Sequence, residues 1–405
     1  MNDEAILQDL AKRVAEIGAD ERMTQRKQQW AAHNDLQPGR AMILVFPEGA
    51  WRELLPNSVL ECEDERARAE EWSLRARIYA YDHIYDDTVH EALWNVPKSV
   101  NHSSWGLNIQ HTASPQETGA WGFDPVIKSE ADLDKLTAPQ VSVDEAASDA
   151  ALAHAQERYG VLLDVRQRGV SHISFHLMNL YCQLRGLDQV MWDMYDDPAM
   201  LHRAMSILEA GNRGIIEQYQ QLGLLELNND NTYHSSGGNG WTNQLPAPGY
   251  SGEVRLADMW ASAEAQEMAE VSPEMHAEFI LAYEKRLLEP FGLTGYGCCE
   301  DLTNKLEDVL AIPNIRRISI SPFADVVRCC EIIGPRAIVS WKPHPAQLVG
   351  TFDEAAVRAN LQMAVKAACS NGCTLEMILK DTHTCENHPE RFSMWSTIAQ
   401  QVVNE

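Results

Sequence analysis

The chain has 405 residues, and its 59 acidic and 33 basic side chains give a formal net charge of −26. This charge repels phosphate backbones and anionic lipid over most of the surface, so we expect neither nucleic acid nor a membrane as a partner. No apolar run approaches the roughly 18 residues that cross a bilayer, and the N-terminal segment has no signal-peptide core. We therefore expect a cytoplasmic protein, whose nine cysteines are more readily buried, metal-bound or catalytic than joined in disulfides.

The first hundred residues mix charged helical segments with one strand. Residues 1–35 are predicted to form an amphipathic helical extension, AMILVF at residues 41–46 a strand, and the charged residues 61–85 a partly solvated helix. No low-complexity linker, close repeat or composition shift marks a boundary. Residues 1–405 are therefore predicted to form a single domain.

Turn-forming residues are concentrated in NNDNTYHSSGGNGWTNQLP, residues 228–246. A plain turn needs neither His234 nor Trp241, so we favour a loop that shapes a pocket, with His234 as a candidate catalytic residue and Trp241 as a candidate substrate contact. The alternative is a stretch that only turns. The shorter NHSSWG, residues 101–106, has a similar composition, and its His102 is given no role.

The second half of the chain alternates between strand-like and helix-like segments. The β-rich runs lie at residues 293–298, 316–321, 337–341 and 374–381. One helix is predicted to begin at Ser272, with a proline in its first turn, and to end before Pro290. Another has a capping-box pattern at Thr351 and Glu354 and a left-handed stop at Gly372.

Repeated units of a strand and a helix imply parallel strands. A chain of this length with such units forms either a closed (β/α)8 barrel or a doubly wound sheet, both of the α/β class. No Gly-x-Gly-x-x-Gly turn stands between a strand and a helix, which weakens the dinucleotide-binding version.

Each of the four late strands is followed by polar residues that packing does not require. Because the carboxyl ends of parallel strands open on one face, we expect these residues to converge there although they are far apart in sequence. They are Cys298, Cys299, Glu300 and Asp301 after the first strand, Ser321 and Asp325 after the second, Lys342 and His344 after the third, and Asp381, His383 and Cys385 after the fourth.

Zinc is the metal that suits such a set, because it accepts thiolate, imidazole and carboxylate ligands. The candidate ligands are Cys299, Glu300, His383 and Cys385, with Cys298 in reserve. Adjacent cysteines on a strand point to opposite faces, so the alternative is that one or both of the pair fill small spaces in the core.

Three other features have competing interpretations. Cys329 and Cys330 lie in the helical segment DVVRCCEIIG and are predicted to be core filler. His344 stands between two prolines and is favoured as a loop histidine at a site. Lys342 could be an anion anchor or a solvated charge.

The order of these pieces resembles a known superfamily. The segments LADMWASAEAQEM, VSPEMHAEFILAYEKRLLEPF and IRRISISPFADVVRCCEIIGPRAIVSWKPHPA, with a glycine-rich strand that ends in cysteine between the last two, resemble the uroporphyrinogen decarboxylase-like proteins over residues 256–395. These proteins include zinc-dependent, corrinoid-linked methyltransferases. The resemblance implies a single (β/α)8 TIM-type barrel, here with an N-terminal helical extension, and a site at the strand carboxyl ends.

The resemblance also implies a ligand set. In the methyltransferase branch, zinc is held by a His-x-Cys pair after the strand that follows the SPE helix and by a cysteine after the last strand. Cys299 and Cys385 match the two cysteines, but Gly297 stands where the histidine should be. Glu300, Cys298 or His383 could replace that histidine, with Glu300 preferred, and a version without metal stays open.

The function that the resemblance implies is methyl transfer between a small methylated substrate, such as a methyl ether, methylamine or methylthiol, and a corrinoid (cobalamin) on a separate protein, as in a demethylation system. His234, His344 and Lys342 are the candidate catalytic residues. The candidate substrate contacts are Trp241, Tyr296, Gln266 and Asp258. A homodimer is left open.

Other classes of protein compete with this hypothesis. A metal-independent decarboxylase of the uroporphyrinogen type would need an arginine-bearing N-terminal motif, and only Arg40 stands beside the first strand. A barrel hydrolase would use zinc to activate water without any corrinoid. A non-enzymatic binding protein would tolerate loss of Cys299 and Cys385.

Overall fold

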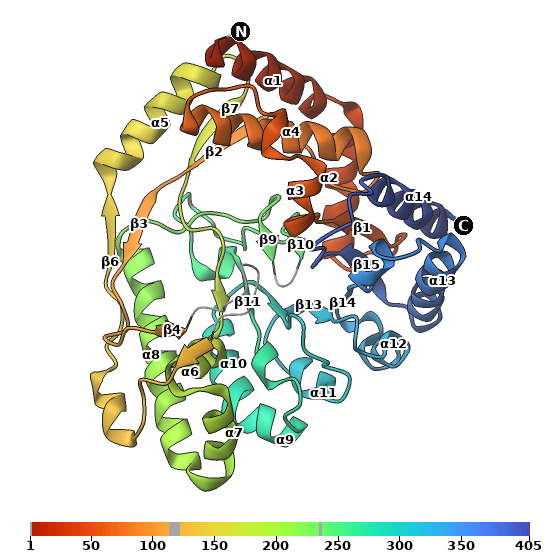
Figure 1. Ribbon diagram of the computed structural model, residues 1–405. Coiled ribbons are helices and arrows are strands. Elements are labelled where there is room, and N and C mark those ends of the chain that lie inside the picture. The colour runs from red at the N-terminus through yellow and green to blue at the C-terminus, as the bar shows by residue number, and fades with distance from the viewer. Residues whose placement is uncertain (1, 113–121, 235–236) are drawn as a thin grey trace.

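The computed structural model describes residues 2–112, 122–234 and 237–405. In this part of the chain seven parallel strands form the central sheet (Figure 1), in the order β1-β15-β14-β13-β12-β11-β8. Their bounds are β1 Met42–Val45, β15 Thr374–Leu379, β14 Ile338–Trp341, β13 Ile315–Ile320, β12 Leu293–Tyr296, β11 Trp260–Ala263 and β8 Ser174–Phe175. The four late strands and the early one are thus confirmed, and they are neighbours in space.

The expected closure into a barrel is not seen in the described strands, because β1 and β8 stand at the two edges of the sheet. Side chains occupy the outer edge of β1 in place of another strand. The Ile43 N–H donates to the Asp87 carboxylate at 2.9 Å, and the Val45 N–H donates to the Asp86 carboxylate at 2.9 Å. Carboxylates that accept these ladder hydrogen bonds satisfy the edge without a further strand.

Smaller strand pairs lie outside the central sheet. The pair β2–β7 is parallel, and β3–β6, β4–β5 and β9–β10 are antiparallel. Their bounds are β2 Leu93–Pro97, β3 Ser99–His102, β4 Gln110–Thr112, β5 Gly122–Asp124, β6 Val141–Asp144, β7 Asp164–Arg168, β9 Tyr233–His234 and β10 Gly238–Asn239.

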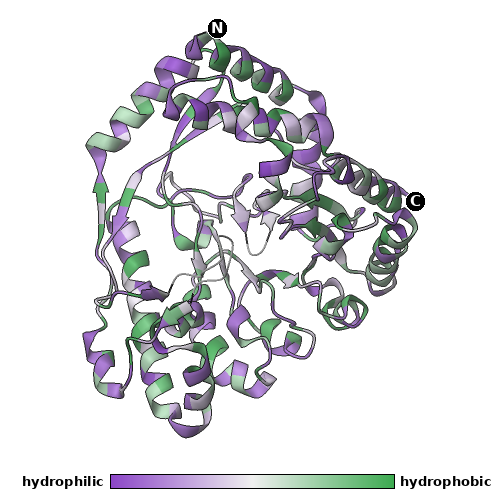
Figure 2. Cartoon of the chain, viewed as in Figure 1, coloured by the Kyte–Doolittle hydropathy of each residue, from purple (hydrophilic) through white to green (hydrophobic). Residues whose placement is uncertain are grey.

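Helices surround the central sheet, and hydrophobic and hydrophilic residues alternate along them (Figure 2). The bounds are α1 Asp3–Gly18, α2 Glu21–Asn34, α3 Trp51–Leu54, α4 Glu65–His83, α5 Glu145–Tyr159, α6 Leu177–Arg185, α7 Leu187–Asp196, α8 Pro198–Gln221, α9 Pro273–His276, α10 Ala282–Leu288, α11 Leu306–Val309, α12 Val326–Ile333, α13 Glu354–Asn371 and α14 Glu390–Asn404. Helix α13 packs between α12 and α14, and α1 packs on α4. In the described ranges, no helix combines the length and the apolar character that a membrane span requires.

The helix ends follow their capping residues, with one correction. Ser272 caps α9 as predicted, but a π-helical segment, Ala277–Leu281, joins α9 to α10. Gly372 ends α13 in the left-handed conformation at φ 65°. The N-cap of α13 is Asp353 and not Thr351, because the Asp353 side chain accepts the hydrogen bond from the Ala356 N–H at 3.0 Å.

The central strands are apolar on the face that packs against helices and largely polar on the other face. In β14, Val339 and Trp341 belong to the main hydrophobic core, whereas Ser340 lies on the opposite face. In β15, Met377 and Leu379 belong to the same core, and Glu376 lies on the other face. Cys329 and Cys330 of α12 are both fully buried in this core, as predicted.

A buried ion pair lies on the polar face of the sheet. The Arg317 Nε atom lies 2.8 Å from Glu376 Oε1, and neither side chain is exposed. Arg317 also donates to Asn34 Oδ1 of α2 at 2.7 Å, and its guanidinium lies 5.1 Å from the centre of the Trp260 ring. Burial alone would raise the pKa of Glu376, but Arg317 and His33 outweigh it and hold this pKa well below its usual range.

This pair predicts a large loss of stability in Glu376→Gln. The variant leaves the Arg317 charge buried without its partner, so we expect unfolding free energy to fall by about 3–5 kcal/mol in urea titrations at neutral pH. The loss should shrink as the pH falls below the ordinary range of a glutamate, because the stability from a depressed carboxyl pKa is fully present above the unfolded-state pKa and is lost as the pH falls through the folded-state pKa.

Glu307→Gln is the matched control, because Glu307 is three-quarters exposed and lies 3.5 Å from Arg336. A surface pair of this kind contributes less than about 1 kcal/mol. Equal losses in the two variants would contradict a special role for the buried pair.

Candidate functional site

Polar residues follow the carboxyl ends of five central strands and form what we call the mouth cluster. Its members are His176 after β8, Glu264 after β11, Cys298 after β12, Lys342 after β14 and Lys380 after β15. Because side chains alternate along a strand, the first residue after β11, β14 and β15 continues the polar face that carries Ser262, Ser340 and Glu376. In parallel α/β sheets this end of the strands is where ligands bind.

His176 and Glu264 form a histidine–carboxylate pair at one side of the mouth cluster. The Nδ1 atom of His176 is hydrogen-bonded to Glu264 Oε1. Glu264 is 5% exposed, and its other oxygen accepts the Gln266 N–H at 2.9 Å. Burial opposes protonation of the imidazole, but the hydrogen bond and charge of Glu264 outweigh it. The pKa of His176 is therefore raised.

Lys342 lies in the interior, where its ammonium group donates to neutral oxygens. Its Nζ atom lies 2.6 Å from Ser319 Oγ, 2.9 Å from the Ser340 carbonyl and 3.1 Å from Ser340 Oγ. The side chain is almost fully buried, and burial lowers the pKa of Lys342 to about 7, although Glu376 acts against this shift. A lysine with such a pKa can hold or release a proton near neutral pH.

The charged form of Lys380 is favoured more strongly than that of Lys342. Lys380 donates to the Tyr233 hydroxyl at 3.3 Å and lies 3.7 Å from Asp381 and 3.9 Å from Glu48. Burial acts to lower its pKa, but Tyr233 and Asp381 outweigh it, so the pKa of Lys380 is raised. The mouth cluster thus contains Lys380, whose charged form is favoured, and Lys342, which can gain or lose a proton near neutral pH.

The two adjacent cysteines lie in the turn after β12. Their Sγ atoms are 3.5 Å apart. The hydrogen bond to Cys298, followed by burial, raises the pKa of Cys299. Glu300 accepts the Cys298 N–H at 2.8 Å and the Ala265 N–H at 3.3 Å, and burial raises the pKa of Glu300 to about 7.

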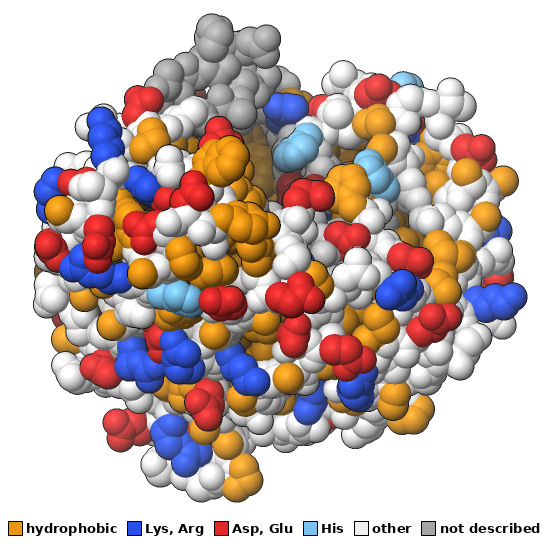
Figure 3. Space-filling model, turned by 90° about the horizontal axis from the view of Figure 1, so that it is seen from below, with side chains coloured by type: hydrophobic (Ala, Val, Ile, Leu, Met, Phe, Trp, Pro, Cys, Tyr) orange, Lys and Arg blue, Asp and Glu red, His pale blue; other side chains and the backbone are white. Residues whose placement is uncertain are grey.

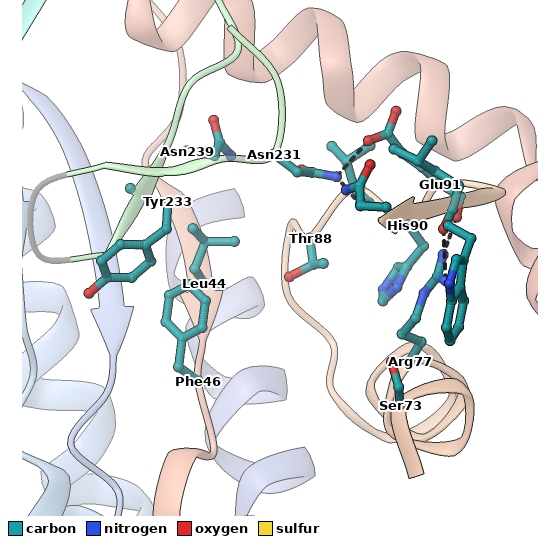
Figure 4. A pocket seen from close by; sticks show the side chains of 15 residues that line it. Leu44, Phe46, Ser73, Arg77, Thr88, His90, Glu91, Asn231, Tyr233 and Asn239 are labelled. Carbon is teal, nitrogen blue, oxygen red and sulfur yellow. Dashed lines mark hydrogen bonds between the residues drawn. The ribbon is translucent and has the colours of Figure 1, made fainter. Parts of the chain in front are cut away.

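Two cavities meet at Tyr233. The smaller has a volume of about 140 Å³ and is lined by His172, Ser174, His176, Tyr233, Ser262, Ala263, Glu264, Gly297 and Cys298. The larger has a volume of about 460 Å³ and lies beside β1 and the 88–95 segment. Figure 4 shows Tyr233 and Phe46 together on one wall of the larger cavity, with Thr88, His90 and Arg77 across from them. On the face shown in Figure 3, acidic and basic side chains are interspersed with hydrophobic ones.

The structure does not assemble the predicted zinc ligands into one group. Cys385 is fully buried, and its thiol donates to the Glu53 carboxylate at 3.1 Å. His383 is exposed, and Glu300 is engaged by the backbone N–H groups of Cys298 and Ala265. Within residues 2–112, 122–234 and 237–405, no three His, Cys, Asp or Glu side chains are grouped so that they could hold a metal ion. These residues, as arranged, do not fit a zinc site.

His234 and Trp241 of the glycine-rich loop and His344 after the third late strand lie in three different surroundings. His234 is buried, its ring stacks on Trp260 with the centres 5.3 Å apart, and its Nε2–H donates to the Asn228 carbonyl. Trp241 donates to Asn231 Oδ1 at 3.0 Å, outside both cavities. His344 is exposed and caps a short 3-10 turn through the Ala346 N–H. Part of the loop, residues 235–236, lies outside the described residues.

The other predicted substrate contacts lie away from the mouth cluster, apart from Gln266, whose backbone supports Glu264. Tyr296 points to the helix side of β12, where its hydroxyl donates to Glu284 Oε2 at 2.9 Å. Asp258 precedes β11 and so lies at the opposite, amino end of the strands. There it pairs with Arg255 at 2.7 Å.

Sequence reasoning missed His176, Glu264 and Lys380. A pattern that could have found His176 and Glu264 is the alternation of apolar and polar residues in ISFH at residues 173–176 and in ASAE at residues 261–264, whereas the apolar Ile378 interrupts this pattern before Lys380. A buried parallel strand usually reads as an unbroken apolar run, so polar residues at every second position mark an interior polar face.

The His176–Glu264 pair predicts a shift in titration. In Glu264→Gln the opposing effect of burial remains while the carboxylate charge is lost, so we expect the pKa of His176 to fall below that of the wild type. Histidine NMR titration measures this. Glu278→Gln, which alters the exposed partner of His202 at 3.2 Å, is the control and should leave His176 unchanged. A Glu264→Gln spectrum with an unaltered His176 titration would show that the pair does not form.

Comparisons with known proteins support the fold. No protein-family model matches the sequence, and no curated protein sequence is significantly similar to it. Among solved structures, the chain is similar to a methyltransferase from Methanosarcina mazei, with 10% sequence identity and a TM-score of 0.53 over 93% of this chain and 98% of that one. At this identity the likeness supports the fold alone, an α/β fold with a large parallel sheet and many helices that is consistent with the TIM type.

Proposed function

We propose that the protein is a methyltransferase that moves a methyl group between a small methylated substrate and a corrinoid carried by a separate protein. The observation that carries the proposal is the fold likeness, over nearly the whole chain, to a protein described as a methyltransferase. The mouth cluster supports it, because it gathers a proton donor and positive charges where a substrate of this fold would bind.

The chemistry required is displacement at a methyl carbon. The acceptor forms a bond to that carbon, the bond between the carbon and the substrate heteroatom breaks, and the heteroatom keeps the electron pair. Oxygen, nitrogen and sulfur leave more readily when a nearby acid protonates them or when positive charge stabilises the developing anion. The corrinoid, when bound, supplies the nucleophilic cobalt that makes this displacement feasible at a methyl group.

The residues of the mouth cluster have separate roles in this proposal. His176 lines the smaller cavity, and the Glu264 carboxylate favours its protonated form, so in this reaction it donates a proton to the leaving heteroatom. Lys342 and Lys380 follow β14 and β15 and supply positive charge at the same end of the sheet. Glu264 orients the imidazole and is a positioning residue.

Zinc stays a prediction of the sequence, and no step above depends on it. Metal analysis of the purified wild type beside Cys299→Ser and Cys385→Ser tests the prediction. Stoichiometric zinc that is lost in both variants would support a shared site. Zinc-free wild type, or zinc retained in both variants, would remove it.

The methyltransferase proposal predicts a corrinoid-dependent reaction. The purified protein is mixed with free cob(I)alamin and, in separate runs, with 4-hydroxy-3-methoxybenzoate, trimethylamine or methanethiol. We expect the absorbance change of methylcobalamin formation with one class of donor. Failure with every donor, together with release of carbon dioxide from carboxylated substrates, would favour the metal-independent decarboxylase instead.

Lys342→Met tests the role of the buried charge. Removing one preorganised charge-stabilising group typically lowers kcat by about 100-fold or more, and we expect a loss of that size. Lys366→Met is the control, because Lys366 is exposed on α13 and should tolerate the change. An unchanged kcat in Lys342→Met would exclude this lysine from the reaction.

A further inference from the structure

The smaller cavity brings together a thiol, an imidazole and a carboxylate from three strands. Cys298 follows β12, His176 follows β8 and Glu264 follows β11, and all three line the cavity of about 140 Å³. A nucleophile, a base and a group that orients the base form the arrangement used by thiol-dependent acyl transfer enzymes on unrelated folds. Neither the sequence resemblance nor the fold likeness assigns such a role to these residues.

The imidazole is held in an orientation suited to act as a base. Its Nδ1 atom is engaged by Glu264, which leaves Nε2 as the atom that can exchange a proton with a neighbour in the cavity. Glu264 itself is fixed, because its second oxygen accepts the Gln266 N–H and its backbone N–H donates to the Phe175 carbonyl at 3.2 Å. About half of the His176 side chain is exposed, so solvent and substrate can reach it.

The backbone fixes the position of Cys298. Gly297 has a φ of 95°, and a Cβ at this position would lie 2.7 Å from Leu302, so the turn requires glycine. Beyond that turn, the Cys298 N–H is held by Glu300 at 2.8 Å, and its carbonyl accepts the Ser319 hydroxyl at 3.0 Å. The thiol is therefore presented to the cavity by a rigid turn at the end of a central strand.

We propose that Cys298 is a nucleophilic thiol that accepts short acyl groups from activated esters or thioesters. His176 deprotonates the thiol, and Glu264 is a positioning residue that orients the imidazole. This activity goes beyond the proposed methyl transfer and needs no corrinoid. A cavity of about 140 Å³ limits the acyl group to a few heavy atoms, such as acetyl.

The reaction balances with the groups present and water. The Cys298 proton passes to His176 Nε2, and the sulfur attacks the carbonyl carbon of the ester. The tetrahedral intermediate collapses, the bond from carbon to the leaving oxygen or sulfur breaks, and the leaving group takes the proton from His176. Water, deprotonated by the same nitrogen, then attacks the thioester, releases the carboxylic acid and restores the thiol.

The Tyr233 hydroxyl is the candidate hydrogen-bond donor to the oxyanion of the tetrahedral intermediate. Tyr233 lines the same cavity, and its hydroxyl accepts a hydrogen bond from Lys380 at 3.3 Å. A hydroxyl polarised by an ammonium group is a good donor to a developing oxyanion. Tyr233→Phe is therefore expected to slow acylation more than it weakens ester binding.

Reaction with p-nitrophenyl acetate tests the proposal. In the full-length protein we expect a burst of p-nitrophenolate with an amplitude equal to the protein concentration, and an acetyl group on Cys298 in peptide mapping by mass spectrometry. Cys298→Ala should abolish the burst. Cys369→Ala, which removes an exposed cysteine of α13, is the matched control and should keep it.

The acylation rates of variants test the roles of His176 and Glu264. His176→Ala should lower the acylation rate by about 100-fold, and added imidazole should restore part of it, which a merely misfolded variant would not allow. Glu264→Gln should lower the maximal rate without changing the ester concentration at half saturation.

An acetyl group found on Cys299 or Cys369, or a full burst in Cys298→Ala, would overturn the proposal. So would a wild type that gives no burst. Because the assay contains no corrinoid, these outcomes are separate from success or failure of methyl transfer.

Discussion

The buried pair of Arg317 and Glu376 is the interaction on which the interior of this fold depends. Two full charges on the polar face of the sheet are tolerable only because they face each other and are hydrogen-bonded, and the guanidinium also contacts Asn34 and Trp260. The pair joins β13 to β15 across β14 and ties α2 to the same place. It also determines the environment of Lys342, since Glu376 is the anion that acts most strongly to keep that lysine charged.

The open edge of β1 lies beside the larger cavity. Asp86 and Asp87 accept the backbone N–H groups that another strand would have paired with, so the sheet stops at β1. The larger cavity lies beside this edge, and Tyr233 separates it from the smaller one.

The mouth cluster brings basic groups together in an acidic protein. The chain as a whole is strongly acidic, but Lys342, Lys380 and His176, whose protonated form Glu264 favours, lie together at the strand ends. Basic groups at the strand ends favour substrate groups that develop negative charge during reaction. Both the leaving group of a methyl transfer and the oxyanion of an acyl transfer have this property, so both proposals draw on the same electrostatic feature.

Local patterns in the sequence determined the strands β12 to β15, the Ser272 and Gly372 helix ends and the place of Lys342 and Cys298 after their strands, because periodicity, capping and turn chemistry act over a few residues. Tertiary structure alone decided that Cys385 bonds to Glu53 and not to a metal shared with Cys299, and that His176 meets Glu264 from 88 residues away. It also decided that the sheet ends at β1. These outcomes depend on which strands become neighbours and on how buried charges are paired, and such long-range choices leave no local trace in the amino-acid order.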